Sequence, residues 1–313
     1  MISLKDVKVD EIQKRLFAEV AGLHEIPMGA YNLRANGESI GRDSTENIQI
    51  TGKEDGSGID IRIAPGTKNE SVHIPVVLSE SGIKETVYND FYIGEGADVV
   101  IVAGCGIDNC GNQDSQHDGI HRFYVERGAK VKYVEKHYGS GDGQGARILN
   151  PVTEVYQDEG SYVEMDMEQI KGVDSTERET FAELKKDAKL VVKERLMTHG
   201  RQNAISLYKV TIKEEGGSAD VVSRSVARDD SYQKFDACVI GNAPCHGHTE
   251  CDSIIMDNGR ILAVPSLEAN DVDAELFHEA AIGKIAGEQL IKLMTLGLTE
   301  AEAEEQIING FLK

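Results

Sequence analysis

A 32-residue repeat constrains the fold of this chain more than any other feature of its sequence. The segments FYIGEGADV (91–99), FYVERGAKV (123–131) and VYQDEGSYV (155–163) align without gaps and place a glycine at the same position each time. Looser copies follow at residues 185–190 and 215–221. Because a unit this short cannot bury its own apolar face, a fixed period indicates a stack of similar units.

The repeated units have the composition of short β-strands. From about residue 30 to residue 265, runs of Val, Ile, Tyr and Thr are separated by Gly, Asp and Asn, with no helical pattern between them. We therefore predict a mainly β fold, a β-helix or β-solenoid, in which glycine supplies backbone freedom at each corner. The alternative is a β-sandwich whose segments resemble one another by chance.

Helical patterns flank the β region at both ends. Apolar residues recur at helical spacing between Ile12 and Val20, which predicts a short amphipathic helix. Residues 273–297 are rich in Ala, Leu, Glu and Lys and predict a longer helix, and Thr299 with Glu302 predicts the capping box of a second one. The predicted division is a helical segment at 1–25, a β-helix core at 26–270 and a C-terminal helical hairpin at 271–313.

The charge of the chain limits its partners. Asp and Glu number 54 against 33 Lys and Arg, which gives a formal net charge of -21 and a pI of about 4.8. Such a chain repels a phosphate backbone and an anionic membrane surface, so we expect neither nucleic acid nor membrane as a partner. The sequence contains no run of eighteen apolar residues and no uncharged signal-peptide core, which predicts a soluble, cytoplasmic protein.

Five cysteines, an odd number, favour reduced thiols over a disulfide framework. The segment from Cys245 to Cys251 also holds His246 and His248, and thiolate and imidazole groups bind zinc, copper or iron–sulfur clusters. No C-x-x-C pair of the zinc-knuckle type is present. In an unbroken strand Cys245 would share a face with Cys251, and His246 would share one with His248. The alternative is that Cys238 and Cys245 are small buried residues of the core.

A second group of potential metal ligands lies earlier in the chain. Cys105, Cys110, His117 and His121 fall within seventeen residues, at a loosely zinc-like spacing. The surrounding Gly, Asn and Asp residues indicate an exposed loop between two repeats. Either this loop binds a metal, or His121 simply begins the next strand. Because the repeats stack, we expect this group and the segment 245–251 to lie far apart and to form separate sites.

Three C-terminal segments resemble a known family. CDSIIM (251–256), LEANDVDAELFHEAAIGKIAGEQL (267–290) and GLTEAEAEEQIINGF (297–311) are similar to the C-terminal signature of the SufB/SufD family, the scaffold subunits of the Suf iron–sulfur cluster assembly machinery. The close match covers about sixty residues, and the β-rich repeats agree with it in character. The resemblance implies a right-handed parallel β-helix with terminal helical segments.

The same resemblance implies site residues and partners. It implies that Cys251 receives sulfur or ligates the nascent cluster, that Glu279 is a second ligand, as in the SufB branch, and that His278 matches a histidine of the SufD branch. The implied cofactor is a transient iron–sulfur cluster with its iron, and Cys245 and His248 are further candidate ligands. The implied partners are a SufC-like ABC-type ATPase docked on the C-terminal helices, a second β-helix subunit in a homodimer or a SufB–SufD-type dimer, and a sulfur donor protein.

The chemistry of these residues suits such a scaffold. A thiolate both accepts sulfane sulfur and ligates iron. Carboxylate and imidazole hold iron less firmly than further thiolates would, which favours handing a cluster on over keeping it as a resident redox centre. Adjacent helical residues diverge by about a hundred degrees. On the predicted helix, His278 and Glu279 would therefore meet one cluster only if the helix began irregularly or if each served a different subunit.

Three classes of function remain open. The first is the assembly scaffold, which we expect not to be an enzyme. The sequence contains no G-x-x-x-x-G-K-[ST] segment for binding ATP, so ATP hydrolysis would have to come from a partner subunit. The second is a structural, SufD-like subunit of the same complex that holds no cluster. The third is a β-helical carbohydrate-active enzyme that uses acids such as Asp229, Asp230 and Asp236.

Overall fold

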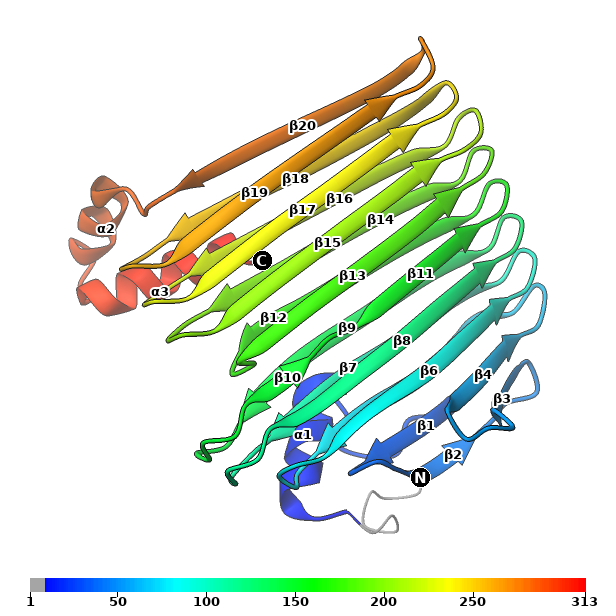
Figure 1. The fold of residues 1–313 in the computed structure, drawn as a ribbon, viewed down its shortest axis with the longest axis horizontal. Helices are drawn as coiled ribbons and strands as arrows, with labels where there is room; N and C mark the ends of the chain where they lie inside the picture. The colour runs from blue at the N-terminus through cyan, green and yellow to red at the C-terminus, as the bar shows by residue number, and fades with distance from the viewer. Residues whose placement is uncertain (1–8) are drawn as a thin grey trace.

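The computed structural model describes residues 9–313 and is a parallel β-solenoid of about eight turns with helices at both ends (Figure 1). The predicted mainly β, stacked fold is thereby confirmed. Residues 1–8 of the predicted segment 1–25 lie outside the described residues. The elements are α1 (Glu11–Ala21), β1 (Ala30–Ala35), β2 (Glu38–Asp43), β3 (Ile48–Gly52), β4 (Gly58–Ile63), β5 (Lys68–Leu78), β6 (Lys84–Ile93), β7 (Asp98–Asp108), β8 (Ser115–Val125), β9 (Lys130–Ser140), β10 (Arg147–Leu149), β11 (Val152–Gln157), β12 (Tyr162–Lys171), β13 (Ser175–Leu184), β14 (Lys189–Thr198), β15 (Asn203–Ile212), β16 (Ser218–Ala227), β17 (Tyr232–Gly241), β18 (Cys245–Ile255), β19 (Arg260–Ala269), β20 (Ala274–Gly283), α2 (Gly287–Met294) and α3 (Glu300–Phe311).

Two ten-stranded sheets form the walls of the solenoid. Sheet A has the order β2-β1-β5-β7-β9-β12-β14-β16-β18-β20, and sheet B has the order β19-β17-β15-β13-β10-β8-β6-β4-β3, with β11 also pairing with β8 and β13. From β5 onward, successive strands alternate between the two sheets, except that β10 and β11 both lie in sheet B, and each strand pairs in parallel with the equivalent strand of the next turn. At the N-terminal end the chain folds back, so that β1 pairs with β2 and β3 with β4 in antiparallel fashion.

The register of the strands explains the sequence repeat. Lys130 pairs with Asp98 on one side and with Tyr162 on the other, so these three turns repeat at the predicted 32 residues. Later turns are shorter: Tyr162 pairs with Lys189, and Lys189 with Ser218, at spacings of 27 and 29 residues. The wall strands keep their length, whereas the connection after a sheet A strand shortens from residues 109–114 to residues 172–174. The later repeats therefore align poorly with the 32-residue period, although their turns still stack on one another.

The repeated glycines occupy the predicted corners. Gly96, Gly128 and Gly160 have φ values of 64°, 62° and 65°, in the left-handed region where a side chain is costly. Each corner also bonds to the next turn: the backbone N–H of Gly96 donates to the carbonyl of Arg127 at 2.9 Å, and that of Gly128 to the carbonyl of Glu159 at 3.0 Å. The corner glycines thus let the chain reverse while stacked turns stay hydrogen-bonded.

Helix α1 covers part of the outer face of sheet A, as Figure 1 shows beside β7 and β9. Asp10 caps its N-terminus by accepting a hydrogen bond from the backbone N–H of Gln13. Leu16 and Phe17 are fully buried against the sheet. Space for the helix comes from glycine on β7, because a Cβ atom at Gly104 would lie 2.4 Å from the carbonyl oxygen of Val20. The predicted amphipathic helix is confirmed.

The C-terminal region differs from the prediction. The expected helix at 273–297 is wrong over Ala274–Gly283, which forms β20 and pairs in parallel with β18 along its length. Ala, Leu and Glu favour a helix by intrinsic propensity, but the edge of β18 offers a row of backbone hydrogen bonds and an inward position for residues such as Leu276. Tertiary pairing therefore overrides propensity. The solenoid continues to Gly283, past the predicted boundary at 270, and His278 and Glu279 lie on a strand.

The two C-terminal helices begin after this strand. The capping box of α3 is present as predicted: Thr299 Oγ1 accepts the backbone N–H of Glu302 at 3.3 Å, and the Glu302 carboxylate accepts the backbone N–H of Thr299 at 2.8 Å. Ile308 and Leu312 pack against Val226 of β16, which holds α3 to the solenoid. No helix within residues 9–313 has the length and apolar character needed to cross a bilayer.

Replacement of Gly128 by alanine tests the corner geometry. We expect the free energy of unfolding to fall by about 1–2 kcal/mol, because a residue with a side chain is strained at this φ. A steric clash would not contribute, since no atom lies within 4 Å of the added Cβ. Gly128→Asn should cost less, because Asn and Asp tolerate this region, as Asp187 does here at φ 54°. Urea unfolding of the two variants measures the difference. Equal losses, or no loss in Gly128→Ala, would contradict the assignment.

Candidate functional site

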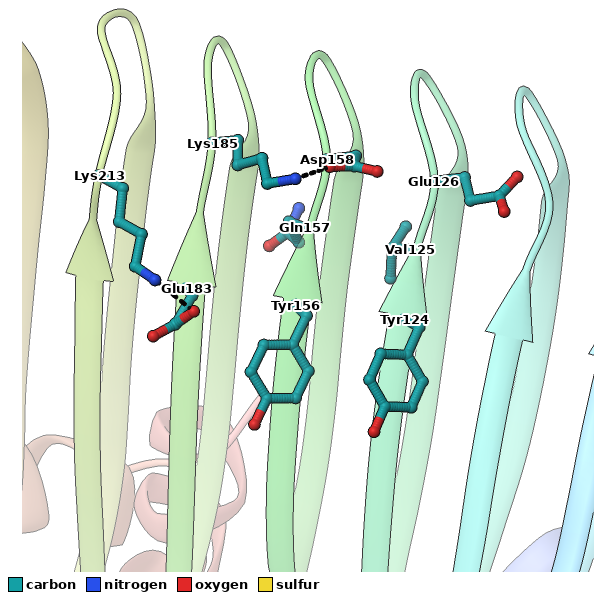
Figure 2. A pocket seen from close by; sticks show the side chains of 9 residues that line it. All are labelled: Tyr124, Val125, Glu126, Tyr156, Gln157, Asp158, Glu183, Lys185 and Lys213. Carbon is teal, nitrogen blue, oxygen red and sulfur yellow. Dashed lines mark hydrogen bonds and ion pairs between the residues drawn. The ribbon is translucent and has the colours of Figure 1, made fainter.

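A surface hollow of about 470 Å³ lies on the outer face of sheet B and is lined by aromatic and charged side chains (Figure 2). Tyr124 and Tyr156 stack with their ring centroids 5.4 Å apart. The lysines at its rim are already paired, Lys185 with Asp158 at 2.5 Å and Lys213 with a glutamate of β13 at 2.6 Å. Neither a thiol nor an imidazole lines this hollow, so the predicted metal ligands lie elsewhere in the structure.

The predicted cysteine and histidine segment forms one regular strand, β18. It is the last strand of sheet A with a neighbour on both sides. Cys245 and Cys251 both face the core, with exposed fractions of 8% and 1%, whereas His246 and His248 alternate with them and face outward. Pro244 precedes the strand and does not break it. The side chains therefore share faces as expected for unbroken strand geometry.

Cys251 lies in the interior beside polar groups. Its Sγ is 3.6 Å from Ser253 Oγ, and its neighbour across the β16–β18 pairing is Ser223, whose hydroxyl donates to Glu194 at 2.7 Å. Burial raises the pKa of the Cys251 thiol, and the nearby Glu194 carboxylate adds to this rise. The thiol is therefore protonated at neutral pH in this conformation. Its use as a nucleophile or ligand requires exposure or a nearby cation.

Strand β20 places the two other principal candidates on opposite faces. His278 pairs in register with Thr249, and its Nδ1 lies 2.9 Å from Thr249 Oγ1, on the inner face that Cys251 shares. His278 is thus a diagonal neighbour of Cys251, with about 8 Å between their Cα atoms at ordinary strand spacings. Glu279 pairs with Glu250 and faces outward. The side chains of His278 and Glu279, which would diverge by about a hundred degrees on a helix, therefore point in opposite directions on this strand.

On the outer face, Glu279 meets two residues of β18. One ligand atom each from His248, Glu250 and Glu279 lies within 4.8 Å of the others, and we call these three residues the outer triad. His248 Nδ1 is 2.8 Å from a carboxylate oxygen of Asp220 on β16. Burial raises the pKa of the Glu250 carboxyl, and the charge of the adjacent Asp252 raises it further. Glu250 was not predicted from the sequence.

Cys245 stands apart from these groups. It begins β18, six residues before Cys251, which corresponds to about 20 Å along an extended strand. Burial raises the pKa of its thiol. The structure thus brings together Cys251 with His278 inside the solenoid, and His248 with Glu279 outside it. Cys245 joins neither pair.

The second predicted group is mostly an interior feature. Cys105 on β7, and His117 and His121 on β8, face the core and are buried. Only Cys110 lies on the exposed connection 109–114, where its thiol donates to Asp108 at 3.3 Å. The predicted exposed loop is shorter than expected because β7 and β8 both extend into the Gly-rich sequence. Cys110 therefore does not share a site with the other three.

Cys105 is held between two imidazoles in the core. Burial opposes ionisation of the thiol, but His117 and His137 outweigh this and lower the pKa of Cys105 to about 7. Burial also opposes charge on both imidazoles, yet Cys105 together with Glu85 raises the pKa of His117 to about 10, and Glu135 together with Cys105 raises the pKa of His137 to about 9. The two imidazoles therefore favour ionisation of this buried thiol.

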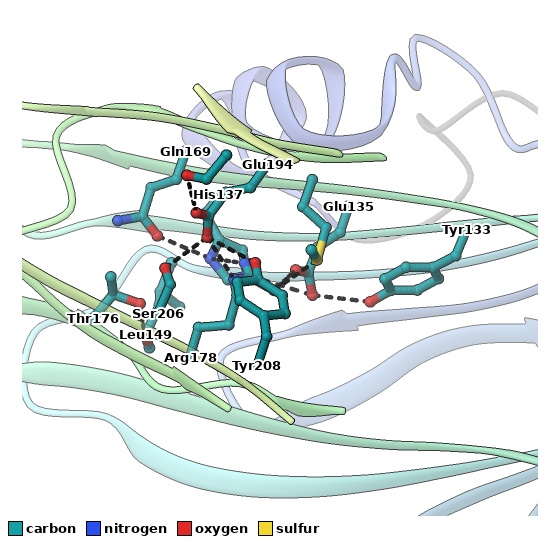
Figure 3. Close-up of polar contacts among 12 residues, drawn as sticks. Tyr133, Glu135, His137, Leu149, Gln169, Thr176, Arg178, Glu194, Ser206 and Tyr208 are labelled. Carbon is teal, nitrogen blue, oxygen red and sulfur yellow. Dashed lines mark hydrogen bonds and ion pairs between the residues drawn. The ribbon is translucent and has the colours of Figure 1, made fainter. Parts of the chain in front are cut away.

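A buried polar network continues from this pair along the core (Figure 3). Arg178 donates to Glu135 at 2.5 Å, and its other terminal nitrogen lies 3.4 Å from His137 Nδ1. Further along, Glu194 accepts three hydrogen bonds, from the hydroxyls of Ser206, Tyr208 and Ser223. Because Ser223 neighbours Cys251, polar groups line the interior between the two thiols.

These interior charges were missed in the sequence, although a signal was present. In β9 the alternate positions Val131, Tyr133, Glu135 and His137 all face inward. A glutamate and a histidine in phase with core residues mark a buried polar site. Cys105 and Cys251 are separated by five strand spacings of sheet A, or about 24 Å. As predicted, the two groups do not form one site.

Comparison with known proteins identifies the family. Residues 86–311 match the family model described as "SUF system FeS cluster assembly, SufBD core domain". The chain belongs to the SufBD family. Membership supports a role in iron–sulfur cluster assembly and agrees with the resemblance of the C-terminal segments.

Archaeal members of the SufBD family are similar over most of this chain. An iron–sulfur cluster assembly SufBD family protein of Methanothermobacter thermautotrophicus (strain Winter) is 28% identical over 82% of this chain and 62% of the relative. A protein of the same description from Archaeoglobus fulgidus is 29% identical, covering 87% and 72%. One from Methanocaldococcus jannaschii is 29% identical, covering 85% of each chain. The chain thus spans less than two thirds of the Methanothermobacter relative.

Buried His121 predicts a loss of stability in acid. Burial lowers its pKa to about 4, against 6.5 for a free histidine. Between these two pH values, the unfolded chain binds a proton at this histidine and the folded chain does not. The contribution of His121 to the free energy of unfolding is therefore fully present above pH 6.5. It is lost as the pH falls from 6.5 to 4, by up to about 3 kcal/mol. Urea unfolding across this range measures the slope. His121→Phe should reduce the slope, whereas the exposed-site control His246→Asn should leave it unchanged; an unaltered slope in His121→Phe would contradict the assignment.

Proposed function

We propose that this SufBD family chain is a scaffold subunit on which iron–sulfur clusters are assembled, with Cys251 as the sulfur-accepting residue. The observation that carries the proposal is the position of that thiol: it faces the interior one strand from the C-terminal end of sheet A, in a chain whose residues 86–311 match the SufBD core domain. Its diagonal neighbour His278 lies on the same inner face. A thiolate with an imidazole nearby suits a cluster that is built and then released.

Cluster formation at Cys251 needs the last turn of the solenoid to move. Its thiol is 1% exposed, and Glu279 points to the opposite side of the strand pair. β20 has a neighbour on one side only, so its hydrogen bonds to β18 are the bonds that separation would break. Displacement of β20 would expose Cys251 and free His278 and Glu279 to turn towards iron. The cluster is cargo here, and a sulfur donor protein would supply its sulfur to Cys251.

The C-terminal helices are the proposed docking site for an ABC-type ATPase. α2 follows β20 after residues 284–286, so a force on this helix acts on the strand that pairs with β18, which carries Cys251. Ile291, Met294 and Leu296 form an exposed apolar surface on and just after α2. ATP-driven movement of a docked ATPase would thereby open the last turn. The hydrolysis would belong to that partner, and this subunit would not act as an enzyme.

The C-terminal end of the solenoid is the proposed dimer interface. β19 and β20 are the end strands of their sheets and carry exposed apolar side chains, among them Leu262, Phe277 and Ile282. A second solenoid pairing there, in a homodimer or a SufB–SufD-type dimer, would bury this surface close to Cys251. The alternative is a SufD-like structural subunit without its own cluster, and it is separated from the scaffold by the behaviour of Cys251. A cytoplasmic location remains a prediction.

Anaerobic reconstitution with ferrous iron and sulfide, in the presence of the ATPase partner, tests the role of Cys251. We expect Cys251→Ala to abolish the retained visible absorption of the cluster, because a ligating thiolate is lost, and Glu279→Ala to reduce it. Cys238→Ala is the matched control, since this half-buried thiol lies on sheet B, and should retain the cluster. Equal absorption in wild type and Cys251→Ala would exclude the proposed scaffold site and favour the structural alternative.

Substitution of the apolar surface tests the docking site. Ile291→Glu and Leu296→Glu should each weaken association with the ABC-type ATPase at least about tenfold, equivalent to about 1.4 kcal/mol, because a charge would be buried without a partner. Size-exclusion or calorimetric titration of the purified pair measures this affinity. Val272→Glu, at a 99% exposed residue between β19 and β20, is the control and should bind normally. Equal affinity in all variants would place the ATPase elsewhere.

A further inference from the structure

We propose that the outer triad, His248, Glu250 and Glu279, binds one divalent metal ion at a site separate from Cys251. In the assembly function this ion is ferrous iron, held before it meets sulfur. The identity of the ion as iron rests on the proposed function, whereas the site itself rests on the geometry of the three side chains.

The triad has the dimensions of a metal site. Its three ligand atoms lie within 4.8 Å of one another, so an ion at their centre would be within about 3 Å of each. Small rotations of the glutamate side chains close this to the usual 2.0–2.2 Å of metal–nitrogen and metal–oxygen bonds. Two strands supply the ligands: His248 and Glu250 from β18, and Glu279 from β20. The parallel register sets Glu250 directly opposite Glu279, which keeps the carboxylates together.

A fourth residue prepares the histidine for binding. Asp220 on β16 lies 2.8 Å from His248 Nδ1, so this nitrogen carries the proton and Nε2 presents its lone pair. A carboxylate that accepts the second ring N–H is the usual support of a metal-bound histidine, because it fixes both tautomer and ring orientation. Asp220 is therefore a positioning residue of the site. This contact comes from outside the triad and holds the imidazole of His248 in place.

One arginine, Arg224 on β16, lies near the triad, and its charge acts on Glu250 without forming an ion pair with it. Within residues 9–313, neither Glu250 nor Glu279 forms an ion pair with lysine or arginine, although many acids on the same sheet do, such as Glu164 with Lys193 at 3.0 Å. Two facing carboxylates repel each other across the strand pair. A divalent cation would remove this repulsion and satisfy both groups at once.

The chemistry of the ligands differs from that of the interior site. One imidazole and two carboxylates suit ferrous, manganous or cobaltous ions, with remaining positions open to water. Cys251 lies on the other face of the same strand and cannot reach the ion without rearrangement of β18 and β20. Iron and sulfur would therefore be held on two sides of one strand pair. Movement of β20, which carries Glu279 and His278, would bring them together.

Anaerobic titration with Co²⁺ tests the site by its optical spectrum. Wild type should bind one Co²⁺ per chain with d–d bands and no thiolate-to-cobalt charge-transfer band, and Cys251→Ala should bind equally. His248→Ala, Glu250→Gln and Glu279→Gln should each weaken binding at least about tenfold, and Asp220→Asn by about tenfold. Glu275→Gln, on the same outward row of β20, is the matched control and should bind as wild type does. An excess of Fe²⁺ should displace the bound Co²⁺ in competition, since Co²⁺ is the tighter-binding of the two ions.

Several results would overturn the site: no binding by wild type, wild-type affinity in the Glu250→Gln variant, or a charge-transfer band that disappears in Cys251→Ala. Thermal unfolding followed by circular dichroism verifies that each variant is folded. The outcome is distinct from that of cluster reconstitution. If reconstitution is independent of Cys251 while the Co²⁺ pattern holds, the scaffold role falls and the metal site stands. The reverse pattern removes the metal site and leaves the scaffold role.

Discussion

Backbone pairing between successive turns fixes the direction of every side chain near the candidate site. β16, β18 and β20 pair residue by residue without a bulge, so inward and outward positions are transmitted unchanged from one turn to the next. This places Cys251 and His278 in the interior and Glu279 on the surface. A slip of one residue would exchange the two faces. The separation of thiol from carboxylate is therefore a property of the fold and not of local rotamers.

The same constraint produces an unusually polar interior. Glu135, Arg178 and Glu194 lie in inward rows, where charge is costly unless it is paired and hydrogen-bonded. The pairing of Arg178 with Glu135, and the three hydroxyls around Glu194, offset that cost. The network is incomplete elsewhere, since the buried hydroxyls of Thr153 and Thr180 find no hydrogen-bond partner among the described residues. Apolar side chains of similar volume would have filled the same space without this cost.

Much of the fold could be predicted from sequence because the repeat is local and regular. The stacked β architecture, the corner glycines and the shared face of Cys245 and Cys251 all follow from period and alternation. The strand β20 could not be predicted in this way, since its composition favours a helix and only the edge of β18 decides otherwise. The polar network and the outer triad depend on register: Arg178 and Glu135 are 43 residues apart, and Glu250 meets Glu279 only because two strands align.

The two tips of the solenoid are not equivalent. At the N-terminal tip the chain folds back through β2 and β3, short antiparallel strands that offer little template to another molecule. At the other tip, β19 and β20 each leave a ten-residue edge free for pairing. Fibre growth needs two receptive tips on every molecule, and this one has a single long one. Association through it would be self-terminating, because two molecules paired tip to tip would have no long edge left to recruit a third.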